Sequence, residues 1–210
     1  MTDTDRQVED DEWIPSKIIL IDQSKRLVEA WQNSFSSFTN VAVLHGDYFQ
    51  LPADAIVSPA NSFGIMDGGI DLAIRDQLGY GIEGKVQKVI VERHHGEMHV
   101  GVAEVVETGQ TRYPFLICAP TMRIPERVPH SLNAYIAFRA ILIACEQYNR
   151  KVGLRAIDSL LCCGLATGIG GMDAKTCSGQ MFVAYKNMLF APVIGRFESI
   201  HEFHRVLHSL

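Results

Sequence analysis

Short apolar runs alternate along this chain with longer stretches in which apolar residues recur every three or four positions. Runs typical of buried strands cover residues 17–22, 41–47, 54–60, 101–109, 115–121 and 156–163. Stretches with the spacing of an amphipathic helix cover residues 24–35, 71–78, 83–96, 131–151, 174–189 and 197–210. Such alternation predicts a layered α/β domain in which helices cover both faces of a mostly parallel sheet.

Composition places the chain among soluble globular proteins. Of its 210 residues, 47% are hydrophobic and 20% are charged, and the formal net charge is -5. No apolar run approaches the ~20 residues that a membrane helix needs, and no cluster of Lys and Arg favours nucleic acid as a partner. Residues 1–13 are mostly acidic and polar, so we expect a disordered acidic tip before one domain over residues 14–210.

The chain contains five cysteines, an odd number, and most of them lie in apolar runs. Buried reduced thiols in a cytoplasmic protein explain this pattern better than disulfides do. His94 and His95 form a pair on a predicted helix, but no Cys or Asp faces them at the spacing of a metal site. We therefore expect no metal and no cofactor.

Two glycine-rich segments, residues 64–71 and 164–172, each lead from a predicted strand into a predicted helix. In α/β sheets, ligands lie beyond the carboxyl ends of strands, where glycine lets the backbone approach a ligand closely. Free N–H groups in such loops and at helix N-termini bind anions, so the two segments could hold a diphosphate between them. Neither segment is a P-loop or a G-x-G-x-x-G motif, and tight turns are an alternative explanation.

Polar side chains in and before the first segment indicate more than a simple turn. Asp71 stands at a predicted helix start, where an ordinary N-cap is one explanation. Asp67 has no such explanation, because a phosphate-binding loop gains nothing from a negative charge; in such a loop Asp67 would point toward the sugar or the leaving group. Asn61 ends a predicted strand and either holds a pair of ribose hydroxyls or forms a turn.

Several segments occur in the order of a known family. Residues 54–61 and the loop that ends in Gly-Gly-Ile-Asp at 68–71 resemble the signature D-A-I-V-N-A-A-N, a glycine loop and V-D. The other matching segments are residues 46–47, 101–109 and 166–171. Together they resemble the macrodomain family over roughly residues 41–190. The resemblance implies a three-layer α/β/α fold with a mixed, mostly parallel sheet.

Macrodomains bind ADP-ribose, and many hydrolyse it from modified proteins. The resemblance implies that Asp47 accepts from the adenine amino group, that Asn61 holds the distal ribose, and that Asp71 lies near its anomeric carbon. The residues expected to bind ADP-ribose are Asp22, Asp47, Tyr48, Asn61, Gly68, Gly69, Ile70, Ala166, Thr167, Gly168, Ile169 and Gly170. Of these, the two glycine-rich segments would line opposite sides of the diphosphate.

Some positions depart from the family pattern. Met66 and Asp67 stand where the family usually has glycines, so the glycine loop is acidic. Gly170 and Met172 occupy positions that are often aromatic.

The termini depart from the family as well. The family's terminal strand and helix do not follow residue 190, and a predicted strand and helix at residues 17–35 precede the domain instead. We therefore predict a circularly permuted arrangement, in which this N-terminal pair takes the place of the C-terminal one. Asp22 would then end its strand close to the adenine.

An acidic pair beside the distal ribose favours catalysis over binding alone. Cleavage of the glycosidic bond passes through an oxocarbenium-like state, which carboxylates stabilise or assist through water. We expect an ADP-ribosyl hydrolase of mono-ADP-ribosylated protein whose catalytic residues are Asp67, Asp71 and Asn61. Asp71 would activate water, and Asp67 would hold or protonate the leaving group. Because a guanidinium pairs well with carboxylates, arginine is the expected site of modification.

Two other functions are open on the sequence alone. A reader module would bind ADP-ribose tightly and release none from any modified protein. An enzyme of small molecules would remove an acyl group or a phosphate from an ADP-ribose metabolite.

Overall fold

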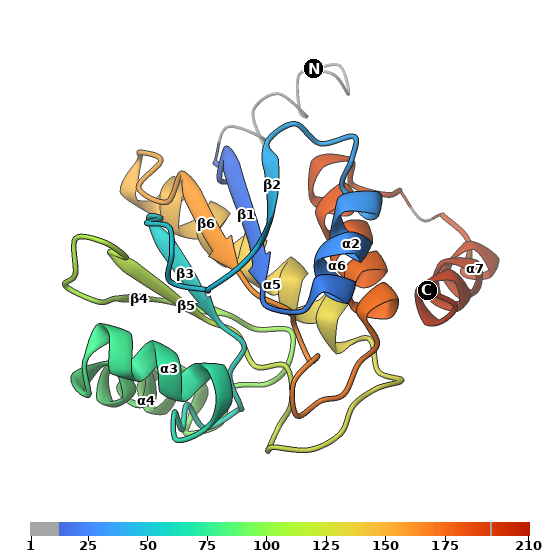
Figure 1. The fold of residues 1–210 in the computed structure, drawn as a ribbon. Helices are drawn as coiled ribbons and strands as arrows, with labels where there is room; N and C mark the ends of the chain where they lie inside the picture. The colour runs from blue at the N-terminus through green and yellow to red at the C-terminus, as the bar shows by residue number, and fades with distance from the viewer. Residues whose placement is uncertain (1–12, 194) are drawn as a thin grey trace.

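The computed structural model describes residues 13–193 and 195–210, which form one six-stranded sheet with helices on both faces (Figure 1). The strands are β1 (Lys17–Asp22), β2 (Val41–His45), β3 (Ala55–Ser58), β4 (Glu104–Glu107), β5 (Phe115–Cys118) and β6 (Ser159–Cys162). Their order across the sheet is β2-β1-β6-β3-β5-β4. Every neighbouring pair is parallel except β4 and β5. The predicted mixed, mostly parallel sheet is confirmed.

Six helices complete the described fold. They are α2 (Lys25–Ser34), α3 (Gly69–Leu78), α4 (Gly81–His94), α5 (Asn133–Val152), α6 (Ala174–Leu189) and α7 (Phe197–His208). Buried side chains of α2, α5 and α6 form a core with one face of the sheet, and those of α3 and α4 form a second core with the other face. The helix α7 contacts α6. The layers are therefore α/β/α, as the alternating pattern predicts.

The strands are apolar along their length because both faces of the sheet are covered. In β1, Ile18 and Leu20 point into the α2, α5 and α6 core, whereas Ile19 and Ile21 point into the α3 and α4 core. All four side chains are at most 2% exposed. Successive side chains of a strand point to opposite faces, so a strand covered on both faces has no polar alternate positions.

The N-terminal strand occupies the position that the permuted arrangement requires. β1 lies between β2 and β6, and Asp22 at its end pairs with His45, just before Gly46 and Asp47. The Ser24 side chain caps α2 by accepting from the Leu27 N–H. The strand and helix that precede the domain are thus integral parts of its central sheet and of one helical layer.

Two helices begin earlier than their patterns predict. α3 begins at Gly69 rather than Asp71, and α4 begins at Gly81 rather than Glu83. Glycine is a weak helix former, so the sequence pattern did not predict helix at Gly69 or Gly81. Glycine in the first turn destabilises a helix little, because the N–H groups there lack helical partners anyway. Asp71 is consequently inside α3, and the N-cap is Gly68, so the N-cap explanation for Asp71 is wrong.

Some predictions concern the ends of the chain. The acidic tip predicted over residues 1–13 lies outside the described residues, apart from Trp13. Within the described part of the chain, no helix combines the length and hydrophobicity needed to cross a bilayer. All five cysteines are buried and free, as their apolar surroundings indicate.

The ladder between β3 and β6 is short, and a tyrosine hydroxyl marks the point where it ends. The two strands pair only at Ala55 with Leu160 and at Ile56 with Leu161. Beyond that point the buried Tyr48 hydroxyl lies 2.7 Å from the Val57 carbonyl and 3.1 Å from the Leu161 carbonyl, and it accepts from the Val57 N–H at 3.2 Å. Beyond Ile56 and Leu161 the two strands are too far apart to hydrogen-bond each other. The Tyr48 hydroxyl takes the place of the missing partner for their backbone groups.

We predict that Tyr48→Phe lowers the free energy of unfolding by about 1 to 3 kcal/mol, because it leaves buried backbone groups of β3 and β6 without a partner. Urea unfolding measures the difference. Tyr80→Phe is the matched control, since Tyr80 is 76% exposed. Equal unfolding midpoints for Tyr48→Phe and the wild type would contradict the bridging role.

Candidate functional site

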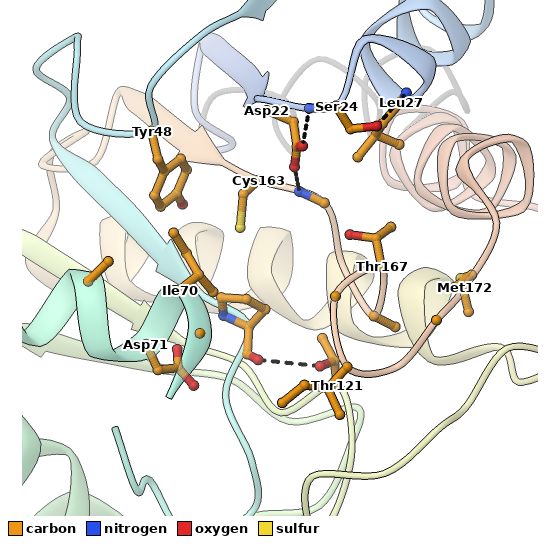
Figure 2. Close-up of a pocket in the computed structure, with 18 of the residues that line it drawn as sticks. Asp22, Ser24, Leu27, Tyr48, Ile70, Asp71, Thr121, Cys163, Thr167 and Met172 are labelled. Carbon is orange, nitrogen blue, oxygen red and sulfur yellow. Dashed lines mark hydrogen bonds between the residues drawn. The ribbon is translucent and has the colours of Figure 1, made fainter. Parts of the chain in front are cut away.

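A cavity of about 880 Å³ opens at the carboxyl ends of β1, β3 and β6. Both glycine-rich segments line it, one leading into α3 and the other following β6 (Figure 2). Of the residues predicted to form the site, those lining the cavity are Asp22, Tyr48, Asn61, Asp67, Gly68, Gly69, Ile70, Asp71, Ala166, Thr167, Gly168 and Ile169. The fold therefore brings together most of a set that spans much of the sequence.

Asp47 and Gly170 are not among the residues that line this cavity. The Asp47 carboxylate accepts the Phe49 N–H at 2.7 Å, so it closes the turn that follows β2. Gly170 lies against the Ala166 carbonyl, where a Cβ atom would collide, and its own carbonyl accepts from the Val128 N–H at 2.8 Å. Both residues shape backbone beside the cavity, and their contact with ADP-ribose stays a prediction.

The start of α3 offers an uncapped helix N-terminus to the cavity. Its N-cap is Gly68, which has no side chain to cap the helix. The N–H groups of Gly69, Ile70 and Asp71 therefore lack the acceptors that a preceding turn would supply. A Cβ atom on Gly68 or Gly69 would meet nothing within 4 Å, so the space beside them is open. Such a terminus attracts an anion through its free N–H groups and the helix dipole.

The two other helices that begin at the cavity are capped by their own side chains. Ser24 accepts from the Leu27 N–H at the start of α2, and Asp173 accepts from the Lys175 N–H at the start of α6. An anion gains less at these two termini, because a hydroxyl and a carboxylate already occupy them. The uncapped α3 is therefore the terminus best suited to a negatively charged ligand.

The loop after β6 faces α3 across the cavity. Ala166 has a φ of 59° and Gly171 a φ of 65°, both in the left-handed region. Bonds from the Gly171 N–H to the Gly168 carbonyl and from the Met172 N–H to the Ala166 carbonyl, both 3.0 Å, close the loop on itself. Left-handed residues turn successive N–H groups toward one side of a loop, which is a known way to bind anions.

Asn61 holds the glycine loop with its side-chain amide. Its Oδ1 accepts from the N–H groups of Phe63 at 3.0 Å and Ile65 at 3.3 Å, and its Nδ2 donates to the Ile65 carbonyl at 2.7 Å. The turn explanation for this residue is therefore correct in part, since the amide oxygen is fully used. One hydrogen of Nδ2 is left for a ligand in the cavity that Asn61 lines.

Asp71 places a buried carboxyl group at the cavity wall. The residue is 8% exposed, and its Oδ1 accepts a 2.6 Å hydrogen bond from the Ser58 hydroxyl at the end of β3. Burial raises the pKa of Asp71 to about 6, against a smaller opposing effect of that hydrogen bond. Asp67, four positions earlier, also lines the cavity but is exposed. The cavity therefore contains two carboxyl groups in different environments.

The family model described as Macro domain matches residues 57–181. This chain belongs to the Macro domain family.

Relatives and solved structures agree with that assignment. An uncharacterized protein of Aquifex aeolicus is 30% identical over 142 residues, which is 68% of this chain and 78% of that protein. The macrodomain of Mycobacterium tuberculosis DarG superposes with a TM-score of 0.55 at 22% identity, covering 69% of this chain and 89% of that one. Thermosipho africanus DarTG in complex with ADP-ribose gives 0.53 at 14% identity, covering 82% and 51%. At these identities the structural matches show a shared fold.

In this macrodomain, Asp22 organises one end of the cavity. Its Oδ1 accepts from the Ser24 N–H at 2.8 Å and its Oδ2 from the Gly164 N–H at 3.2 Å (Figure 2). The carboxylate therefore joins the end of β1 to the start of the loop after β6. Cys163 lies beside it in the cavity wall, and burial, more than the nearby carboxylates Asp22 and Asp71, raises the pKa of its thiol. That thiol is a poor nucleophile at neutral pH.

Several charged side chains outside the cavity pair with one another. Arg93 and His94 both pair with Glu104 of β4, at 2.6 and 2.8 Å, and do not line the cavity. Arg123 pairs with Glu97 through two contacts of 2.7 and 3.0 Å. In the described residues, no group of three or more His, Cys, Asp or Glu side chains could hold a metal ion.

The sequence pattern does not identify Ser58, Ser24 and Arg26 as residues of the site. Ser58 is the only side chain that hydrogen-bonds the Asp71 carboxyl among the described residues, and its place at the end of a strand next to the site was the available signal. Ser24 and Arg26 line the cavity because α2 begins directly after Asp22. Placing Asp22 at the site could have brought in both residues.

We predict that Asp71→Asn stabilises the protein at pH 7 but not at pH 4. Since the folded-state pKa is raised, the folded protein binds more protons than the unfolded chain between about pH 4 and pH 6, and stability falls as the pH rises through this range. Asparagine carries no charge, so the variant avoids this loss of stability, which is on the order of 1 to 3 kcal/mol at pH 7. Its side chain can still accept the Ser58 hydrogen bond. Thermal unfolding at both pH values measures the effect.

The exposed Asp67 supplies the control for this stability experiment. Asp67→Asn should change the melting temperature little at either pH, because no burial is relieved. A melting temperature for Asp71→Asn that falls at pH 7, or that rises equally at pH 4, would contradict the assignment of a buried, ionised carboxylate to Asp71.

Proposed function

We propose that this macrodomain is an ADP-ribosyl hydrolase, which binds ADP-ribose in the cavity and cleaves the bond between the distal ribose and a modified protein side chain. Support for binding comes from the family, from the fold shared with a protein solved in complex with ADP-ribose, and from two glycine-rich segments that line one cavity. The observation that carries the catalytic part is the buried carboxyl group of Asp71 at the start of α3.

The diphosphate would lie between the start of α3 and residues 166–171. Free N–H groups of Gly69 and Ile70 would donate to one phosphate, and those of the opposite loop to the other. The adenosine would extend toward β1 and the start of α2, where Asp22 and Ser24 line the cavity. The distal ribose would then lie toward Asn61, Asp67 and Asp71 on the side of the first glycine loop.

Asp71 would act on the water that attacks the anomeric carbon. As a carboxylate it accepts a proton from that water and stabilises the positive charge that develops on the ribose ring. A pKa of about 6 makes Asp71 a stronger base than an ordinary aspartate while leaving it mostly ionised at pH 7. The Ser58 hydroxyl fixes one carboxylate oxygen, so the other oxygen is available to the water.

Asp67 would act on the leaving group. Its exposed carboxylate lines the same cavity as Asp71 but without the burial, so it is suited to a partner that arrives from solvent. A guanidinium group makes paired hydrogen bonds with a carboxylate, which favours arginine as the modified side chain.

The five buried free thiols fit an enzyme of the cytoplasm, where such thiols stay reduced.

The proposal is tested by incubating the protein with arginine-, serine- and glutamate-linked ADP-ribosylated proteins and measuring released ADP-ribose. We expect release, fastest from arginine. Tight binding of ADP-ribose in calorimetry without release from any substrate would identify a reader module instead. Turnover restricted to small ADP-ribose metabolites would identify the third function considered from the sequence.

We predict that Asp67→Ala and Asp71→Asn each lower kcat by about 100-fold or more, because general acid–base groups contribute roughly that much. Their affinities for ADP-ribose should stay within about threefold of the wild type, since the N–H groups that hold the diphosphate remain. Single-turnover release and calorimetry measure the two quantities. Full turnover by both variants would remove the carboxylates from the mechanism.

We also predict that kcat/KM rises with pH through about pH 6 and then levels off, because Asp71 must be ionised to accept a proton. A profile of initial rates between pH 4.5 and about 8 measures it. Ser58→Ala should move the rise to higher pH, since the Ser58 hydrogen bond favours the ionised form. A rate that falls as the pH rises through this range would contradict a basic role for Asp71.

A further inference from the structure

We propose that Glu83 is a positioning residue for this reaction: its carboxylate fixes the loop that presents Asp67 to the cavity. Glu83 lies in the first turn of α4 and does not line the cavity itself. The inference rests on the proposed function, because it gives Glu83 a role in turnover without contact with ADP-ribose.

One carboxylate joins three parts of the structure. Glu83 Oε1 accepts the Met66 N–H at 3.0 Å, and Oε2 lies 3.4 Å from Nη1 of Arg75 in α3. The side chains of Arg75 and Glu83 are only 17% and 23% exposed. Partial burial strengthens such charged contacts relative to those at an open surface. The loop, α3 and α4 are therefore tied together at Glu83.

The Met66 side chain adds a second anchor at the same position. It is 1% exposed and belongs to the core formed with α3 and α4 residues such as Ile74 and Val86. Because its N–H is bound by Glu83 and its side chain is buried, Met66 is held at both backbone and side chain. Asp67 is the next residue, so its position follows from that of Met66.

The earlier part of the loop is held independently of Glu83. Asn61 bonds the backbone of residues 63 and 65. Gly64, with a φ of 66°, lies so close to α4 that a Cβ atom would come within 2.7 Å of Val86 Cγ1. The hydrogen bond from the Met66 N–H to Glu83 is thus the backbone contact that fixes the loop directly before Asp67.

The start of α3 is also held without Glu83. The hydrogen bond between Ser58 and Asp71 and the fully buried Ile74 fix the first turns of that helix. Loss of Glu83 should therefore displace Asp67 much more than the N–H groups at the start of α3. Misplacing a reacting group by about 1 Å can cost 100-fold in rate, whereas binding by the helix N-terminus would persist.

This arrangement also explains the departure from the family at Met66 and Asp67. Glycines at those positions would leave the loop free to move and would carry no carboxylate. A methionine that is buried and an N–H that is bound give the following aspartate a fixed position. The Glu83 contact thus suits a loop that presents a side chain as well as backbone.

The test compares Glu83→Ala and Glu83→Gln with the wild type in turnover and in hydrogen exchange of the segment 61–71. Glu83→Ala should lower kcat by about 10- to 100-fold with KM changed by less than about threefold. Glutamine keeps an acceptor for the Met66 N–H, so Glu83→Gln should recover kcat to within about threefold of the wild type. Exchange in the segment should be faster in Glu83→Ala alone.

Glu92→Ala is the matched control, since Glu92 lies on the same helix with a 58% exposed side chain whose ion pair is with Lys88. It should leave kcat and exchange unchanged. A kcat for Glu83→Ala within about twofold of the wild type, or equal losses in the Ala and Gln variants, would overturn the positioning role while the proposed function stands. If the wild type itself releases no ADP-ribose, the proposed function fails; unchanged exchange in Glu83→Ala would then overturn the fixed loop as well.

Discussion

The separation of β3 from β6 is the constraint on which the site depends. The strands pair at only two positions before they diverge, and the Tyr48 hydroxyl takes over the backbone groups at the point of divergence. Without this buried partner, either the ladder would continue and close the cavity, or unsatisfied polar groups would be buried. Both glycine-rich segments begin from these two strands, so their separation sets the width of the cavity between them.

Charge is distributed across the cavity in two opposing ways. The uncapped start of α3 and the loop after β6 favour an anion, whereas Asp67 and Asp71 bring negative charge to the same helix start. Two carboxyl groups at that helix start do not help it to bind a diphosphate, because they carry the same sign of charge as the ligand. Burial of Asp71 also costs stability at neutral pH, since its folded-state pKa is raised. Proteins retain costs of this kind at functional sites, which supports a chemical role for the carboxyl group.

The strand β1 and the helix α2 are central parts of this macrodomain. β1 lies inside the sheet, and α2 packs against α6 in one helical layer. The Asp22 carboxylate then bonds backbone N–H groups on both sides of the cavity end, at Ser24 and Gly164. This N-terminal pair therefore contributes both to the core and to the wall of the site.

The sequence by itself determined the order of the strands and helices along the chain and identified the two glycine-rich segments that line the cavity. Apolar runs and helical spacing depend on local burial, which is written in consecutive residues. What they left undetermined was the partner of each polar side chain. Asn61 was expected to hold a ribose, but its amide oxygen binds the loop, and Asp47 closes a turn. Ser58 holds Asp71 and Glu83 holds Met66, and the sequence pattern does not show either pairing. Those contacts join residues 2 to 17 positions apart, and only the folded backbone decides which of the possible partners come within hydrogen-bonding distance.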